Sequence, residues 1–362
     1  MANVYAYGEN VRAKFIDLPE RIEDKTLIPH QVEVHPPPRG KELCWLKCKH
    51  CYTHTVLDEQ QRISGHRILE LVEEISEGSP KTGERPEKLI FSGFRTDPLN
   101  SDVSGDVIEA SKKSGFVTGV HTKGFRMSED FIEKLTANSN RGDYISFSVD
   151  AGNNSTYNLV HGAKNSHAKL YDRVRENVKK LMDGIQSSNS ELQVRVTYLL
   201  TEENCDQQVV DFIKHFREAC VHTIRFSVPI LPTMGSQERR SDFPKVSVYN
   251  LKLFEDRLAK MQEDNDDDLV YLKFDGNTHR VLPCWSRWLL PTIGYDGHLY
   301  PCCLVASKEF ESLRIADLTK ESFWDSYYRQ VDLDHGGANC QCDRKAAEIH
   351  KTVNAVLQQK NY

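Results

Sequence analysis

The hydrophobic residues in the first two thirds of the chain alternate between two patterns. Short apolar, β-branched runs have the length and composition of buried strands, and the stretches between them repeat apolar residues at helical spacing. The runs predict six strands, at residues 31–35, 88–93, 117–122, 143–150, 192–200 and 223–230. The other stretches predict helices at residues 66–76, 106–115, 128–138, 169–184, 207–219 and 248–262. Strands and helices that alternate in this way form parallel sheets with crossover helices.

Residues at the ends of the predicted helices agree with this assignment. Ser128, which is followed by two acidic residues, is a suitable N-cap, and Gly115 and Gly184 suit the position just beyond a helix C-terminus. Six strand–helix units are too few for a closed eightfold barrel. The pattern alone therefore predicts an α/β fold that is either an open or partial barrel or a doubly wound sheet.

Composition narrows the class of protein. The chain has 362 residues, of which 28% are charged and 39% are hydrophobic, as in folded globular proteins. A net charge of −6 argues against a general affinity for nucleic acid or for an anionic membrane. The sequence has no apolar run of the roughly 20 residues that cross a bilayer, and it begins without a signal-peptide pattern. We therefore expect a cytoplasmic protein without nucleic-acid or membrane partners.

The ten cysteines fall into two clusters and two isolated residues. In a reducing compartment, clustered cysteines are more often metal ligands than disulfide partners. Cys44, Cys48 and Cys51 follow the first predicted strand, and their spacing lets one loop hold three irons of a [4Fe–4S] cluster. The fourth iron is then left for a ligand from outside the chain. A partial zinc site is the alternative, although structural zinc sites usually pair two Cys-x2-Cys elements.

This Cys-x3-Cys-x2-Cys motif resembles that of the radical S-adenosylmethionine (SAM) enzymes, which fold as a partial (β/α)6 barrel. The resemblance covers about residues 30–230. It implies a SAM-binding [4Fe–4S] cluster, SAM itself, and a flavodoxin- or ferredoxin-type reductant. It further implies that SAM is contacted from the cysteine loop, from "SGFRTDP", from "FSVDAG" and from the fifth strand. The residues at those positions are His50, Tyr52, Ser92, Gly93, Asp97, Ser148, Asp150 and Arg195.

Two of these matches differ from the family pattern or have an alternative reading. The turn after the second strand keeps one glycine, Gly93, where the family usually has Gly-Gly-Glu-Pro, and Asp97-Pro98 comes two residues later than that pattern predicts. Arg195 resembles an arginine that pairs with the SAM carboxylate, and a planar guanidinium suits that role. A surface ion pair is the alternative for Arg195.

The second cysteine cluster lies in the last eighty residues. The run "TIGYDGHLYPC" predicts a β-hairpin with an Asp-Gly turn at residues 296–297. The cluster resembles the twitch form of the SPASM auxiliary domain, which implies an auxiliary [4Fe–4S] cluster, and a four-cysteine zinc site is the alternative. The implied ligands are Cys284, Cys302, Cys340 and Cys342, with Cys303 as an alternative to Cys340.

These assignments predict a domain plan. It consists of an N-terminal extension (1–30), a radical SAM partial barrel (31–245), a linking helix (246–275) and a small cysteine-rich hairpin and helix extension (276–362). The last segment includes a predicted tail helix at 343–359.

The family chemistry implies a function. SAM is reductively cleaved to a 5′-deoxyadenosyl radical, which abstracts a hydrogen atom from a small hydroxylated or amino metabolite or from a peptide. An oxidoreductase would then pass the remaining electron to the auxiliary cluster. One alternative is a redox-neutral epimerase of a sugar or peptide, in which the thiol of Cys303 returns a hydrogen atom. The other alternative is a non-catalytic iron–sulfur or zinc scaffold.

Overall fold

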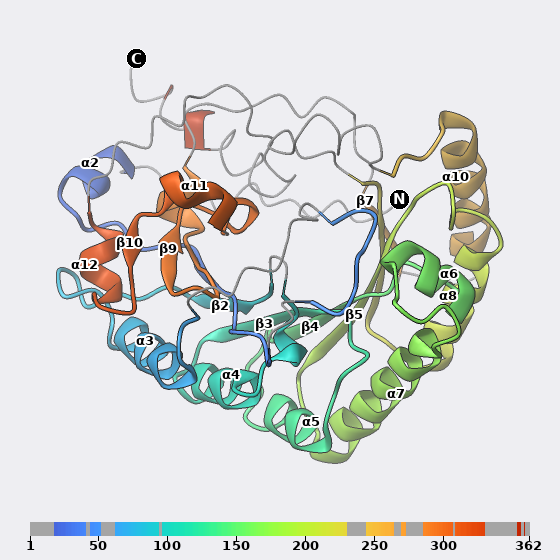
Figure 1. Ribbon diagram of the computed structural model, residues 1–362, viewed down its shortest axis with the longest axis horizontal. Helices are drawn as coiled ribbons and strands as arrows, with labels where there is room; N and C mark the ends of the chain where they lie inside the picture. The colour runs from blue at the N-terminus through green and yellow to red at the C-terminus, as the bar shows by residue number, and fades with distance from the viewer. Residues whose placement is uncertain are drawn as a thin grey trace.

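The computed structural model describes residues 18–40, 44–51, 62–93, 96–229, 244–263, 269–272, 285–306, 308–329, 353–355 and 358. These residues form one curved sheet with helices around its outer face (Figure 1). The strands are β1 (Gln31–Val34), β2 (Lys88–Phe91), β3 (Val117–Thr122), β4 (Tyr144–Ser148), β5 (Gln193–Leu199), β6 (Thr223–Ser227), β7 (Leu269–Leu272), β8 (Thr292–Ile293), β9 (His298–Tyr300) and β10 (Ala316–Asp317).

The helices are mainly crossovers between neighbouring strands. The α-helices are α2 (Leu18–Glu23), α3 (Gly65–Glu77), α4 (Ser104–Lys113), α5 (Glu129–Thr136), α6 (Asn154–His161), α7 (Leu170–Ser188), α8 (Gln208–Glu218), α10 (Val248–Glu263), α11 (Ser286–Leu289) and α12 (Phe323–Tyr327). The 3-10 helices are η2 (Pro98–Asn100), η3 (Cys303–Val305) and η4 (Lys308–Leu313). No helix in the described part of the chain is both long enough and apolar enough to cross a bilayer.

Strands β1 to β7 run parallel, and each pairs with the next. All six predicted strands are present, and the six predicted helices correspond to α3, α4, α5, α7, α8 and α10. The predicted α/β fold class, a partial TIM-like barrel, is therefore confirmed, and the sheet is open because β7 and β10 are its two edges. The segment expected only to link two domains contributes β7, a seventh parallel strand.

Two of the three predicted helix-end residues are confirmed. Ser128 caps α5 by accepting a hydrogen bond from Phe131 N at 3.1 Å, and Gly115 follows α4 with φ of +77°. The predicted end of α7 at Gly184 is wrong, because the helix continues to Ser188 and ends at Asn189. A Cβ on Gly184 would lie 3.0 Å from Ile132, so this glycine allows α7 to pack closely on α5.

The predicted Asp-Gly hairpin is confirmed, and it belongs to the main sheet. Strand β8 pairs antiparallel with β9, and Gly297 in the turn has φ of +82°. The other side of β8 pairs in parallel with β1, which the sequence did not predict. The sheet thus draws strands from all three predicted segments between residues 31 and 362, while the domain boundaries themselves stay a prediction.

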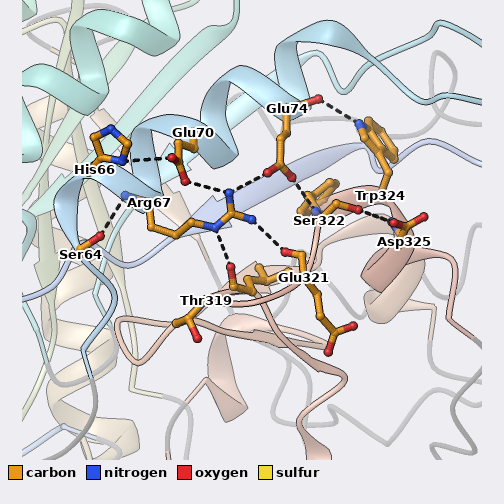
Figure 2. Close-up of polar contacts among 12 residues, drawn as sticks. Ser64, His66, Arg67, Glu70, Glu74, Thr319, Glu321, Ser322, Trp324 and Asp325 are labelled. Carbon is orange, nitrogen blue, oxygen red and sulfur yellow. Dashed lines mark hydrogen bonds and ion pairs between the residues drawn. The ribbon is translucent and has the colours of Figure 1, made fainter.

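The C-terminal segment is also held by a polar network on α3 (Figure 2). Arg67 donates to the carbonyl oxygens of Leu318 and Glu321, each at 2.8 Å, and pairs with Glu74 at 2.7 Å. Glu74 in turn accepts from Phe323 N at 2.7 Å, and its carbonyl accepts from the Trp324 indole at 3.0 Å. One guanidinium therefore joins α3 to the segment between β10 and α12.

The two faces of the sheet differ in polarity. Tyr198 of β5 contacts Phe212 of α8, and Phe226 of β6 contacts Phe254 of α10, so these apolar positions face the helices. Because side chains alternate along a strand, the intervening positions face the opposite, inner face of the sheet. These inner positions carry mostly polar residues, among them Glu33, His121, Tyr144, Arg195 and Arg225.

Candidate functional site

The loop that carries the first three cysteines is seated on the end of α6. The backbone N–H groups of Lys47 and Lys49 donate to the carbonyls of His161 and Val160, at 2.9 and 3.1 Å. Gly162, with φ of +55°, ends α6 at this point. A Cβ there would lie 2.3 Å from the Lys47 carbonyl oxygen, so only glycine lets the loop approach so closely.

The three thiols lie close enough to interact electrostatically. Cys48 is buried, while Cys44 and Cys51 are partly exposed. Burial raises the pKa of Cys44 to about 11 and that of Cys48 to about 12, and the neighbouring thiols add to both shifts. Without a metal these two sulfurs are therefore protonated, and iron would displace their protons. Three sulfurs that lie near one another in a partly buried loop fit three corners of an iron–sulfur cluster.

His161 connects the cysteine loop to the barrel. Its Nδ1 lies 3.2 Å from the Cys48 sulfur, and its Nε2 lies 2.9 Å from the Val149 carbonyl oxygen. Since a carbonyl only accepts, Nε2 carries the proton and Nδ1 accepts from the Cys48 thiol. The ring is fully buried and packs on Tyr157 with centroids 4.3 Å apart. Burial holds the pKa of His161 well below its usual value, so the ring is neutral.

Asp150 is the charged centre beneath this loop. Its Oδ2 lies 3.1 Å from the Lys123 ammonium and 3.6 Å from Nε2 of both His50 and His161. Its Oδ1 accepts from Leu199 N at 2.7 Å. Burial opposes ionisation of Asp150, but the Lys123 ammonium, together with the hydrogen bond from Leu199 N, outweighs it and holds the pKa of this carboxyl below its usual value. Asp150 is therefore an anion tied to four neighbours.

The turn after β2 is fixed by Asp97. Its carboxylate accepts from the Thr122 hydroxyl and from the backbone N–H groups of Leu99 and Lys123, at 2.7 to 2.9 Å. A Cβ on Gly93 would lie 2.2 Å from the Thr96 carbonyl oxygen, so the turn folds back tightly on this glycine. Asp97 therefore joins the end of β2 to the end of β3, close to the start of the Lys123 side chain.

About half of the chain, residues 42–216, matches a known protein family. Residues 42–216 match the family model of the radical SAM superfamily. These residues form a radical SAM domain. Such a domain implies a [4Fe–4S] cluster and SAM, and the proximity of Cys44, Cys48 and Cys51 suits that cluster.

Two curated relatives align with about half of this chain or more. One, from Psychrobacter lutiphocae, is 26% identical over 179 residues, which are 48% of this chain and 57% of the relative. The other, from Flammeovirga pacifica, is 24% identical over 226 residues, which are 60% of this chain and 70% of the relative. Both are named S-adenosylmethionine-dependent nucleotide dehydratase. The chain thus spans less than two thirds of the first relative.

Solved structures share the fold of the radical SAM domain and its surroundings. SuiB of Streptococcus suis, bound to the precursor peptide SuiA, superposes with a TM-score of 0.62 over 88% of this chain and 69% of SuiB, at 11% identity. The structure of anSMEcpe with bound AdoMet gives a TM-score of 0.56 over 91% of this chain and 97% of that chain, at 13% identity. At these identities the likeness concerns the fold alone.

The structure brings several predicted residues of the radical SAM domain together. His50 lies near Cys48, and its Nε2 is 3.6 Å from Asp150, which lies two residues beyond Ser148 at the end of β4. The side-chain atoms of Cys48, His50 and His161 that could bind a metal all lie within 4.8 Å of one another. Tyr52 lies outside the described residues.

Arg195 occupies a different part of the inner face. Its guanidinium lies over the ring of Tyr144, 4.1 Å from the centroid. The pKa of His222 is lowered, mainly by burial and in addition by the positive charge of Arg195. Tyr144 also pairs with His121, whose Nε2 lies 3.0 Å from the phenol oxygen. A Cβ on Gly119 would overlap this ring, so the glycine makes room for it. The pairing of Arg195 with a SAM carboxylate stays a prediction.

Only part of the predicted auxiliary site can be located. Cys302 lies two residues beyond the end of β9, and Cys303 begins η3. Cys284, Cys340 and Cys342 lie outside the described residues, as does most of the predicted tail helix. Val353, one of the described residues of the predicted tail helix, is buried against Leu18, Leu27, Leu289 and Leu290. The auxiliary cluster therefore stays a prediction.

Sequence reasoning missed three charged or polar residues near the site. Lys123 and His161 become functional candidates only through neighbours that are distant in sequence. Glu33 could have been noticed, because a carboxylate within a short apolar strand is unusual. Its Oε1 lies 3.1 Å from His35 Nε2 and accepts a hydrogen bond from Ser92 Oγ. Burial opposes its ionisation, but His35 and Ser92 lower the pKa of Glu33 to about 2.

Proposed function

We propose that this chain is a radical SAM oxidoreductase that acts on a small hydroxylated or amino metabolite or on a peptide. Cys44, Cys48 and Cys51 would hold a [4Fe–4S] cluster. The observation that carries the proposal is that one loop, seated on the end of α6, holds these three thiols close enough to interact electrostatically. When bound, the cluster supplies the electron that cleaves SAM and yields the 5′-deoxyadenosyl radical.

Residues around the triad would shape the SAM site. We assign Gly93, Ser92 and Ser148 to its walls, because they lie at the carboxyl ends of β2 and β4. Asp97 and Asp150 accept hydrogen bonds from the backbone of the barrel, and these bonds hold the strand ends in place. His50 and Tyr52 would complete the site from the cysteine loop.

The inner face of the sheet would hold the substrate. Glu33 is ionised there, and the His121 and Tyr144 pair offers both a hydrogen-bond donor and an acceptor. Such groups suit a substrate that bears hydroxyl or amino groups. Oxidation removes a second electron and a proton after hydrogen abstraction. We assign proton acceptance to the His121–Tyr144 pair, and the electron would pass to an auxiliary cluster held by Cys284, Cys302, Cys340 and Cys342.

Dehydration of a nucleotide is the second candidate. The names of the two curated relatives favour it, and their alignments cover about half or more of this chain. Cationic side chains on the inner face, Arg195 and Arg225, suit an anionic substrate. Dehydration would remove water from the substrate, whereas oxidation removes two hydrogen atoms.

The experiment offers both substrate classes to the anaerobically reconstituted protein with SAM and dithionite. Nucleoside triphosphates form one set, and aminocyclitols, sugars and short peptides form the other. Mass spectrometry should find a product that has lost two hydrogen atoms, together with 5′-deoxyadenosine. A product that has lost water would replace the oxidoreductase proposal with the dehydratase. Deuterium from D2O on a carbon of the product, without a change of oxidation state, would indicate an epimerase that uses Cys303.

A further inference from the structure

A buried ion pair lies directly behind the cysteine loop. Lys123 follows β3, Asp150 follows β4, and their charged atoms are 3.1 Å apart. The Asp150 side chain is 3% exposed and that of Lys123 is 17% exposed, so water screens the pair only weakly. Asp150 adopts a left-handed conformation, with φ of +57°, which an aspartate tolerates.

Short contacts join the ion pair to the cysteine loop. The Asp150 carboxylate lies 3.6 Å from Nε2 of His50, which belongs to that loop. The path from Asp150 to the sulfur is short, since Nε2 of His161 is 3.6 Å from Asp150 and its Nδ1 is 3.2 Å from Cys48. The anion is thus separated from the Cys48 sulfur by one buried imidazole ring, and the cation is in contact with that anion.

The pair is not needed to join β3 to its neighbours. The backbone of Lys123 is already held by Asp97, and the backbone carbonyl of Asp150 accepts from Asn204 at 2.8 Å. The Lys123 side chain is only 17% exposed, and a charge in such a place costs desolvation energy. The presence of the Lys123 charge at this buried position points to a role in the site formed by the cysteine loop.

We propose that Lys123 and Asp150 are positioning residues that set the reduction potential of the cluster held by Cys44, Cys48 and Cys51, with Lys123 raising the potential and Asp150 lowering it. This inference rests on the proposed function. A cluster that gains an electron becomes more negative, and a nearby cation in a weakly screened interior stabilises that form. A nearby anion has the opposite effect, so the pair as a whole keeps the potential between two extremes.

The test is a double-mutant cycle on the reconstituted protein without SAM. The variants are Lys123→Met, Asp150→Asn and the double variant, and the midpoint potential is measured by EPR-monitored redox titration. Lys123→Met should shift the midpoint to a more negative value, Asp150→Asn to a more positive value, and the double variant should return toward the wild type. Lys134→Met is the matched control, because Lys134 also pairs with aspartates but lies on α5 at the surface.

The outcome separates a tuning role from a structural one. A structural role would lower iron content in both single variants without opposite shifts of the midpoint, and that result would overturn the inference. If Lys123→Met fails to fold, the near-isosteric Asp150→Asn still decides, because an unchanged midpoint there contradicts the proposal. The titration does not depend on SAM cleavage. A wild-type protein that binds a cluster but makes no 5′-deoxyadenosine would therefore refute the enzyme function and leave this test intact.

Discussion

The sulfur of Cys48 lies 3.2 Å from Nδ1 of His161, although 113 residues separate the two in the sequence. The histidine is held from its other side by the Val149 carbonyl at the end of β4. The cysteine loop is thus positioned by the barrel as well as by its own backbone. Partners that orient metal ligands in this way commonly affect metal affinity.

His161→Ala should weaken the hold on the cluster. The loop would lose its side-chain contact to Cys48, and we expect roughly tenfold faster iron loss, in line with other outer partners of metal ligands. Anaerobic iron release to a chelator, followed by absorbance, measures this rate. His66→Ala is the control, because that side chain is 83% exposed on α3. Equal release rates in wild type and His161→Ala would show that His161 does not support the site.

Glu33→Gln should remove a pH-dependent part of the stability. The folded pKa of Glu33, about 2, lies below the usual 4.5, so the ionised carboxylate stabilises the fold above about pH 4.5. This contribution is lost as the pH falls from 4.5 toward 2. At neutral pH we expect the variant to lose about 2 kcal/mol of unfolding free energy. Urea denaturation at several pH values should show the gap closing in acid, and a gap that stays constant would contradict the assignment.

Arg67→Ala should release the segment between β10 and α12 from α3. The two carbonyls that accept from Arg67 would lose their donor, and we expect a loss of about 2 kcal/mol. Hydrogen exchange should increase in residues 316–328. Lys113→Ala, which breaks an exposed pair with Glu109, is the control and should cost less than about 0.5 kcal/mol. Unchanged exchange in this segment would mean that Arg67 is not what attaches it.

Cys302→Ser should remove the proposed auxiliary cluster and spare the first one. Iron content should then fall from about eight to about four atoms per chain, as expected for the loss of one [4Fe–4S] cluster. Cys220→Ser is the control, because Cys220 is exposed and stands apart from both cysteine clusters. A wild-type content near four irons would refute the auxiliary cluster.

The sequence predicts the strand–helix series well because each unit is encoded by its own local periodicity. Pairing of β8 with β1 has no such local signal, since two residues of β8 meet a strand more than 250 positions earlier. Strand β7 is short and follows an acidic stretch that reads as a loop. Gly184 was also misassigned from local sequence. A glycine suits a helix end, but this one lies within α7 and allows the helix to pack closely on Ile132 of α5.

The residues of the candidate site also fall into two groups, those that a local motif identifies and those that only the fold brings together. The spacing of Cys44, Cys48 and Cys51 is a local motif, so the sequence alone identifies them. Lys123 and His161 carry no such motif, and their importance comes from the fold that brings β3, β4 and α6 to one place. The proximity of Asp150 to SAM stays a prediction, and its bonds to Leu199 N and to Lys123 could not be read from the sequence.

The most direct measurement of the central claim is the formation of 5′-deoxyadenosine from SAM without added substrate. Wild-type protein and Cys48→Ser are reconstituted anaerobically with iron and sulfide, reduced with dithionite and analysed by chromatography. We predict 5′-deoxyadenosine from the wild type and none above background from Cys48→Ser, with Cys220→Ser matching the wild type. A wild-type protein that carries a reduced [4Fe–4S] cluster and binds SAM, yet forms no 5′-deoxyadenosine, would contradict the assignment of this chain as a radical SAM enzyme.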